Sequence, residues 1–159
     1  MEMKKIIVYL KKETTGKIDF ANIDYLENYF RELLLKLRDV YDINIKGFYN
    51  VKVYIDELYG IVLELEAEDI DYGDYYNQIE MRIIPIYTTF LYQVDDFINN
   101  IDVQTILYHD EFYLKIDKNI SLKNYYLVMD YAKIVYNNTD NIIKYGKVLK
   151  HFNFKKIML

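Results

Sequence analysis

The spacing of apolar residues along the chain switches between the two-residue period of strands and the period of about 3.6 residues of helices. Residues 4–10 predict a first strand. A long helix is expected next, beginning after Asp19 or Asn22, because either side chain can accept a hydrogen bond from the first helical N–H groups. Its apolar residues recur every three or four positions and form one stripe: Ile23, Leu26, Phe30, Leu33, Leu34, Leu37 and Tyr41.

The next part of the chain has the alternation that is typical of half-buried strands. Residues 48–56 and 61–66 each alternate in this way. The Gly-containing segment 56–60 between them predicts a β-hairpin. Another strand is expected over 79–83, and Pro85 would end it or confine it to a sheet edge.

Three further strands are expected over 88–94, 103–108 and 111–116. The last two are expected to pair through a turn at His109-Asp110. Because the strands carry polar or charged residues on one face, the sheet should have one wet side, as antiparallel sheets usually do.

Two helices are expected at the C-terminal end. Ser121 can cap the first, whose stripe is Leu122, Tyr125, Val128, Met129, Ala132 and Val135. Thr139 or Asp140 can cap the second, whose inner face is Ile142, Ile143, Leu149 and Phe152. The connector over 137–139 is short, which favours an antiparallel helical hairpin.

Together these elements predict a single α+β domain over residues 1–159, a length that suits one hydrophobic core. We expect two layers: a mainly antiparallel sheet of about six or seven strands, and the long N-terminal helix packed on it. The C-terminal helical hairpin, residues 118–159, would form a basic subdomain.

Composition narrows the compartment and the source. The chain has no cysteine, so disulfides and thiolate chemistry are excluded. Only residues 6–10 follow the basic N-terminus as an apolar run, and no run approaches the roughly 18 residues of a membrane span. We therefore expect a cytoplasmic protein without a membrane partner. Frequent Ile, Asn, Lys and Tyr indicate an AT-rich genome, such as that of a low-GC bacterium or of its phages and plasmids.

Charge is distributed unevenly along the chain. Residues 1–60 are neutral, residues 61–117 carry 13 acidic and two basic residues, and residues 118–159 carry eight basic and two acidic ones. The net charges of 0, −11 and +6 add to the overall −5. The acidic third is either a solvated face, as charge runs often are, or a field that steers a cationic partner.

The second interpretation defines a candidate partner-binding set that combines carboxylates with tyrosines, which are common at interfaces. Its members are Glu66, Glu68, Asp69, Asp71, Tyr72, Asp74, Tyr75 and Tyr76. The expected partner is a basic protein, for example a nucleic-acid-binding one. The expected role is that of a non-enzymatic inhibitor or regulator from a phage or other mobile element. A homodimer through Tyr-rich strands is a further alternative.

The same carboxylates leave a metal-dependent, phosphodiester-cleaving enzyme open as an alternative. Asp69, Asp71, Asn77 and Glu80 fall at positions 1, 3, 9 and 12 of a Ca²⁺ loop, but Gly73 falls at position 5 instead of 6. The flanks also read as strands instead of helices. A carboxylate cluster for Mg²⁺ would need Asp95 and Asp96 together with Glu64, Glu66 and Glu80. The spacing of these residues in the sequence is not typical of a metal site. We assign no metal site.

No catalytic residue is assigned either. The two histidines, His109 and His151, lie far apart in sequence, and the only serine, Ser121, reads as a helix cap. The glycines form no phosphate-binding motif, and no cofactor is expected.

A basic patch near the C-terminus interleaves lysines with aromatic residues: Lys144, Lys147, Lys150, Lys155 and Lys156. On a helix, these lysines would bind nucleic acid or an anionic membrane, or they would face water or the acidic sheet. The acidic overall pI of 5.1 argues against a dedicated nucleic-acid binder.

Overall fold

The computed structural model describes residues 5–15, 21–68, 79–95 and 103–149. The chain divides into two compact units, residues 1–87 and 88–159. The fold is α+β, as predicted. The prediction of one sheet of six or seven strands is wrong, because the described strands form two separate sheets of four and five strands. That both units belong to one domain stays a prediction.

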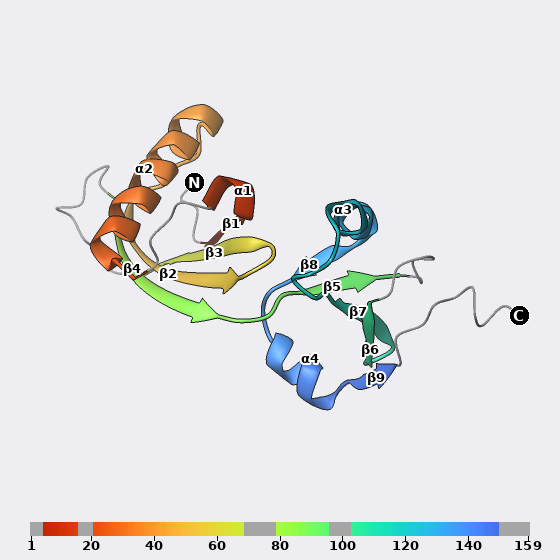
Figure 1. Cartoon of the computed structure of the whole chain (residues 1–159). Helices are drawn as coiled ribbons and strands as arrows, with labels where there is room; N and C mark the ends of the chain where they lie inside the picture. The colour runs from red at the N-terminus through yellow and green to blue at the C-terminus, as the bar shows by residue number, and fades with distance from the viewer. Residues whose placement is uncertain (1–4, 16–20, 69–78, 96–102, 150–159) are drawn as a thin grey trace, which may run out of the picture. The chain divides into compact units, whose positions relative to one another are not determined.

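The first unit is a four-stranded sheet with a long helix on one face (Figure 1). The strands follow the order β1 (Lys5–Lys11), β3 (Gly60–Ala67), β2 (Gly47–Asp56) and β4 (Ile79–Tyr87). β3 is antiparallel to both β1 and β2, whereas β4 is parallel to β2. The short helix α1 (Lys12–Thr15) follows β1, and the long helix is α2 (Ile23–Tyr41).

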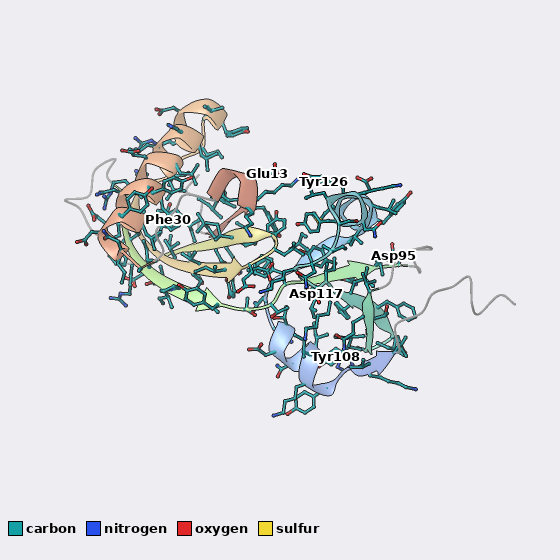
Figure 2. All side chains as sticks on the ribbon, in the orientation of Figure 1. Glu13, Phe30, Asp95, Tyr108, Asp117 and Tyr126 are labelled. Carbon is teal, nitrogen blue, oxygen red and sulfur yellow. The ribbon has the colours of Figure 1, made fainter. Side chains whose placement is uncertain are left out.

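The core of this unit lies between α2 and one face of the sheet. Leu26, Phe30 and Leu34 of the predicted stripe are fully buried on the helix; Figure 2 labels Phe30. Beneath them, strand register aligns apolar side chains in rows across the sheet, such as Val8, Leu63 and Val53. The two-residue period therefore places one set of strand residues under α2 and the alternate set on the outer face.

Local signals at the ends of these elements were predicted correctly. Asn22 caps α2, its Oδ1 accepting from the Tyr25 N–H at 3.1 Å. The β2–β3 hairpin forms, and Asp56 Oδ2 holds its loop by accepting the N–H groups of Leu58 and Tyr59 at 2.9 and 2.8 Å. Pro85 lies within β4, at the edge of the sheet.

The hairpin loop is also tied to the end of β1. The Lys12 N–H donates to the Tyr59 carbonyl at 2.6 Å. Gly60 follows at φ +123°, where a Cβ would lie 2.5 Å from the Leu10 carbonyl oxygen. A side chain is therefore excluded at Gly60 by both conformation and space.

Arg31 links α2 to the edge strand β4. Its Nε donates to the Ile79 carbonyl at 3.0 Å, and its Nη2 lies 3.3 Å from Glu80 Oε2. Its Nη1 donates to Asn28 Oδ1 at 3.0 Å, so the planar guanidinium is held from three sides.

The second unit is a five-stranded antiparallel sheet with a helix on each face. The order is β8 (Lys133–Val135), β5 (Leu91–Val94), β7 (Glu111–Lys115), β6 (Gln104–Tyr108) and β9 (Lys147–Leu149). α3 (Leu122–Tyr131) packs Val128 against Tyr92 and Leu114. α4 (Thr139–Tyr145) packs Ile142 against Leu91 and Ile106, which lie on the alternate face.

The expected turn between β6 and β7 is confirmed. His109 and Asp110 have φ values of 48° and 63°, and Tyr108 pairs with Glu111 on either side of them. Two successive residues at positive φ are typical of the type I′ turns that match the twist of hairpin strands. The predicted pairing of these two strands through the His109-Asp110 turn is therefore correct.

The predicted C-terminal helical hairpin is wrong. α3 ends at Tyr131, and residues 133–135 pair with β5 as β8. α4 ends at Tyr145, and residues 147–149 pair with β6 as β9. The β-branched pair Ile134-Val135 favours a strand, and so short an apolar run fits either period. The basic subdomain over 118–159 thus contributes both edge strands of the second sheet.

Gly146 ends α4 and begins the path into β9. A Cβ at this position would collide with the Ile106 side chain and the Ile142 carbonyl oxygen. We expect Gly146→Ala to destabilise the protein by roughly 1–3 kcal/mol, because rigid neighbours would have to move. Urea unfolding followed by circular dichroism measures this loss, with the exposed Lys144→Ala as control. Equal stability of the two variants would contradict the close approach.

Tyr113 is buried in the second sheet and donates its hydroxyl to Glu111 Oε2 at 2.8 Å. Burial, followed by this hydrogen bond and the Glu111 charge, raises the pKa of Tyr113 from 10.0 to about 12. The folded state holds the proton more tightly than the unfolded state. Its stabilisation is therefore complete below about pH 10 and is lost as the pH rises towards 12.

We accordingly expect Tyr113 to ionise above the usual range of a tyrosine, at about pH 12. An ultraviolet difference titration of Tyr113→Phe against the wild type isolates this phenol. Glu111→Gln should lower the pKa of Tyr113 only in part, because burial is the larger cause. Ionisation of Tyr113 near pH 10, the ordinary value of the group, would show that the phenol is solvated.

Candidate functional site

The described part of the predicted partner-binding set begins on the outer face of β3, opposite α2. Leu63 and Leu65 point into the core, so Glu64 and Glu66 leave the strand on the other side. Glu68 continues this alternation one residue past the strand, where its N–H donates to the Phe48 carbonyl at 3.0 Å. Glu64, Glu66 and Glu68 are called the carboxylate row.

Glu64 is the buried member of the carboxylate row, with a residue exposure of 9%. Strand register places it between Ile7 on β1 and Lys52 on β2. Lys5 reaches it diagonally, with Nζ 3.7 Å from Oε1. Burial, and secondly the Glu64 charge, raise the pKa of the nearby Tyr54. Glu64 is therefore buried and paired with Lys5 within the first sheet.

The other two members are placed differently. Glu68 Oε1 accepts from Asn50 Nδ2 at 2.8 Å, so an amide on β2 holds this carboxylate. Glu66 lies between Lys5 and Asn50 in register, and its side chain is exposed. Glu66 is thus the member whose charge water and a partner can reach.

Apolar side chains share this outer face. Ile7 and Tyr9 on β1 are 42% and 49% exposed, and Ile84 on β4 is 42% exposed. The exposed Arg82, opposite Asn50 on β4, places its guanidinium 5.9 Å from the centroid of the Phe48 ring. Accessible aromatic and aliphatic groups beside fixed charges are typical of protein–protein contact surfaces.

The rest of the acidic third does not extend this surface as far as the structure describes it. Glu80 is held by Arg31 at 3.3 Å. Four other carboxylates belong to the second unit: Asp95, Asp110, Glu111 and Asp117 (Figure 2 labels Asp95 and Asp117). The segment with Asp69, Asp71, Tyr72, Asp74, Tyr75 and Tyr76 lies outside the described residues. Of the predicted partner-binding set, the structure describes Glu66 and Glu68, and both lie in the carboxylate row. Glu64 is the member of this row that the prediction did not include.

The described residues contain no group of three or more His, Cys, Asp or Glu side chains that could hold a metal ion. Geometry explains this for the carboxylate row, because residues at alternate strand positions lie roughly 7 Å apart and do not converge. Asp69, Asp71 and Asn77 of the suggested Ca²⁺ loop, and Asp96 of the Mg²⁺ alternative, lie outside the described residues.

The basic patch is not carried by one helix, which corrects the prediction. Lys144 lies in the last turn of α4, with Nζ 5.2 Å from the centroid of the Tyr145 ring. Lys147 is exposed on the edge strand β9. Lys150, Lys155 and Lys156 lie outside the described residues, as does His151.

Ser121 caps α3 as predicted, its Oγ accepting from the Asn124 N–H at 3.2 Å. Among the helices that the structure describes, none is both long and apolar enough to cross a membrane.

Comparisons of the chain with known protein families, with curated proteins and with solved structures find no match.

Sequence reasoning missed the groups that hold the carboxylate row. Lys5 and Asn50 come from strands on either side of β3, and Ile7 and Tyr9 add the apolar part. Alternation within residues 48–56 indicated which residues of that strand share a face, whereas the apolar run over 6–10 gave no such signal. The pairing of β1 with β3 would also have been needed, and the sequence pattern does not supply it.

We expect the Lys5–Glu64 ion pair to stabilise the first sheet, because Lys5 partly compensates a buried carboxylate. Lys5→Met should lower the free energy of unfolding by about 0.5–1 kcal/mol more than Lys11→Met. Lys11 is a matched control at the other end of the same face of β1, opposite Gly60. Urea unfolding of the two variants measures the difference, and equal losses would show that the pair contributes nothing.

Proposed function

We propose that the protein is a non-enzymatic protein-interaction module that binds a basic partner through the outer face of its first sheet. The observation that carries the proposal is the exposure of the Glu66 carboxylate. Glu66 lies between two carboxylates that are held by Lys5 and Asn50. A partner's Lys or Arg side chain would meet Glu66 in a surface that is already ordered.

The apolar side chains next to the carboxylate row supply binding affinity, which exposed charges alone provide only weakly. Electrostatic complementarity mainly sets specificity and association rate, while affinity comes from well-packed side chains that exclude water. Ile7 and Tyr9 lie on the strand next to the carboxylate row and are partly accessible. A partner that covers them would also exclude water from the Glu66 ion pair, which raises its Coulomb attraction at the cost of desolvating both charges.

The acidic surplus of the chain supports a cationic partner. The part of the acidic third that belongs to the first unit, residues 61–87, has seven acidic residues and one basic residue, a net charge of −6. The carboxylate row leads directly into Asp69, Asp71 and Asp74 in sequence. Such a field attracts basic surfaces and repels acidic ones. If the partner is a nucleic-acid-binding protein, occupation of its phosphate-binding surface would make this protein an inhibitor or regulator.

A charge reversal tests this function. Affinity capture from a low-GC bacterial lysate identifies a partner, and calorimetry then measures its affinity for wild type, Glu66→Lys and Glu32→Lys. Glu32 is an exposed carboxylate on α2, on the other side of the sheet. We expect Glu66→Lys to weaken binding by roughly tenfold or more, whereas Glu32→Lys changes it little.

The salt dependence of the same titration gives a second readout. Binding should weaken at high ionic strength, because screening reduces attraction between exposed charges. If a captured partner binds Glu66→Lys and the wild type equally well, or binds independently of salt, the carboxylate row is not its site.

A further inference from the structure

The two edges of the first sheet differ in how they are protected against another strand. Exposed edges readily pair with further chains, and proteins block them with proline, charges or covering groups. β4 has such devices, because Pro85 lacks an N–H and Arg31 binds both the Ile79 carbonyl and the Glu80 side chain. β1 is the other edge, and the described residues add no strand beyond it.

The inward side of β1 is only partly covered. Ile6, Val8 and Leu10 pack against the core but remain half-buried, whereas their partners Leu65, Leu63 and Ile61 on β3 are fully buried. A further strand beside β1 would place its inward side chains next to these three residues and extend the apolar layer that lies under α2.

β1 is also held in an extended conformation before any partner arrives. All seven of its residues pair with β3, and the Lys12 N–H bond to the Tyr59 carbonyl holds its C-terminal end. A strand that is already ordered loses little conformational entropy when a peptide pairs with it.

The charges on β1 determine which kind of strand can pair with its free edge. Its outward residues are Lys5, Ile7, Tyr9 and Lys11, with a lysine at each end. In an antiparallel pair of two copies centred on Val8, Lys5 would lie opposite Lys11, and opposed like charges destabilise a sheet. A strand with an acidic residue at each end would instead place a carboxylate opposite each lysine.

We propose that β1 is a strand-addition site for an extended, acidic segment of a partner protein. β1 adjoins the carboxylate row, because Lys5 pairs with Glu64 and lies opposite Glu66. The free edge of β1 nevertheless differs from that face in selecting an acidic partner, through Lys11 and the exposed part of Lys5. The segment has apolar residues at alternate, inward positions and a carboxylate at each end. Backbone pairing with β1 provides affinity, and Lys5 and Lys11 provide the preference for acidic sequences.

The test uses the full chain and two blocked synthetic peptides of seven residues, the length of β1. One is Glu-Val-Thr-Val-Thr-Val-Glu and the other has Lys at both ends. We expect the acidic peptide to bind roughly tenfold more tightly, as two cross-strand charge pairs imply. Amide chemical-shift changes should centre on residues 5–11.

Two variants make the result specific. Lys11→Glu should remove the preference for the acidic peptide, whereas Lys36→Glu, an exposed lysine on α2, should leave it unchanged. Equal binding of both peptides, or shift changes centred on β4 or on the second unit, would overturn the proposal. So would a wild-type dimer, seen by sedimentation, whose contact maps to β1, because a second copy would then occupy the edge.

Discussion

The two-residue alternation of β3 is the constraint on which the first unit depends. Leu63 and Leu65 are buried beneath α2, and Glu64 and Glu66 point to the opposite face. A register slip of one residue would exchange these sets and bury two carboxylates in the core. The free energy that fixes the core therefore also fixes the carboxylate row. Neither set can move without the other.

The two units differ in how helices cover the faces of their sheets. In the first, α2 lies on one face and the described residues place no helix of similar length on the other. In the second, α3 and α4 pack on opposite faces of one sheet. The second arrangement buries alternate residues on both sides. The first buries Val62 and Tyr54 on its outer face but leaves Glu66 and Ile7 accessible there. This difference is why the candidate site belongs to the first unit.

Most local chemistry was readable from the sequence, whereas long-range pairing was not. One local prediction was wrong: the N-cap of α4 is Asn138, and Thr139 and Asp140 lie inside the helix. Asn22, Asp56 and Ser121 bond to backbone groups within three residues, so their types and positions sufficed. The strands at 133–135 and 147–149 exist because β5 and β6 accept them at the edges of a sheet, and a three-residue segment has no period of its own. The division into two sheets depends on such pairings. For the site, alternation predicted which glutamates share a face, but Lys5 reaches Glu64 only through the pairing of β1 with β3.

The bond between Lys12 and Tyr59 has a consequence for how the first sheet opens. It joins the chain just after β1 to the loop of the β2–β3 hairpin, next to the contact between Gly60 and Leu10. Fraying of β1 from its C-terminal end must therefore disturb the hairpin loop at the same time. The three antiparallel strands should exchange their amide hydrogens as one cooperative block, without the gradual loss of protection that a loosely attached edge strand shows.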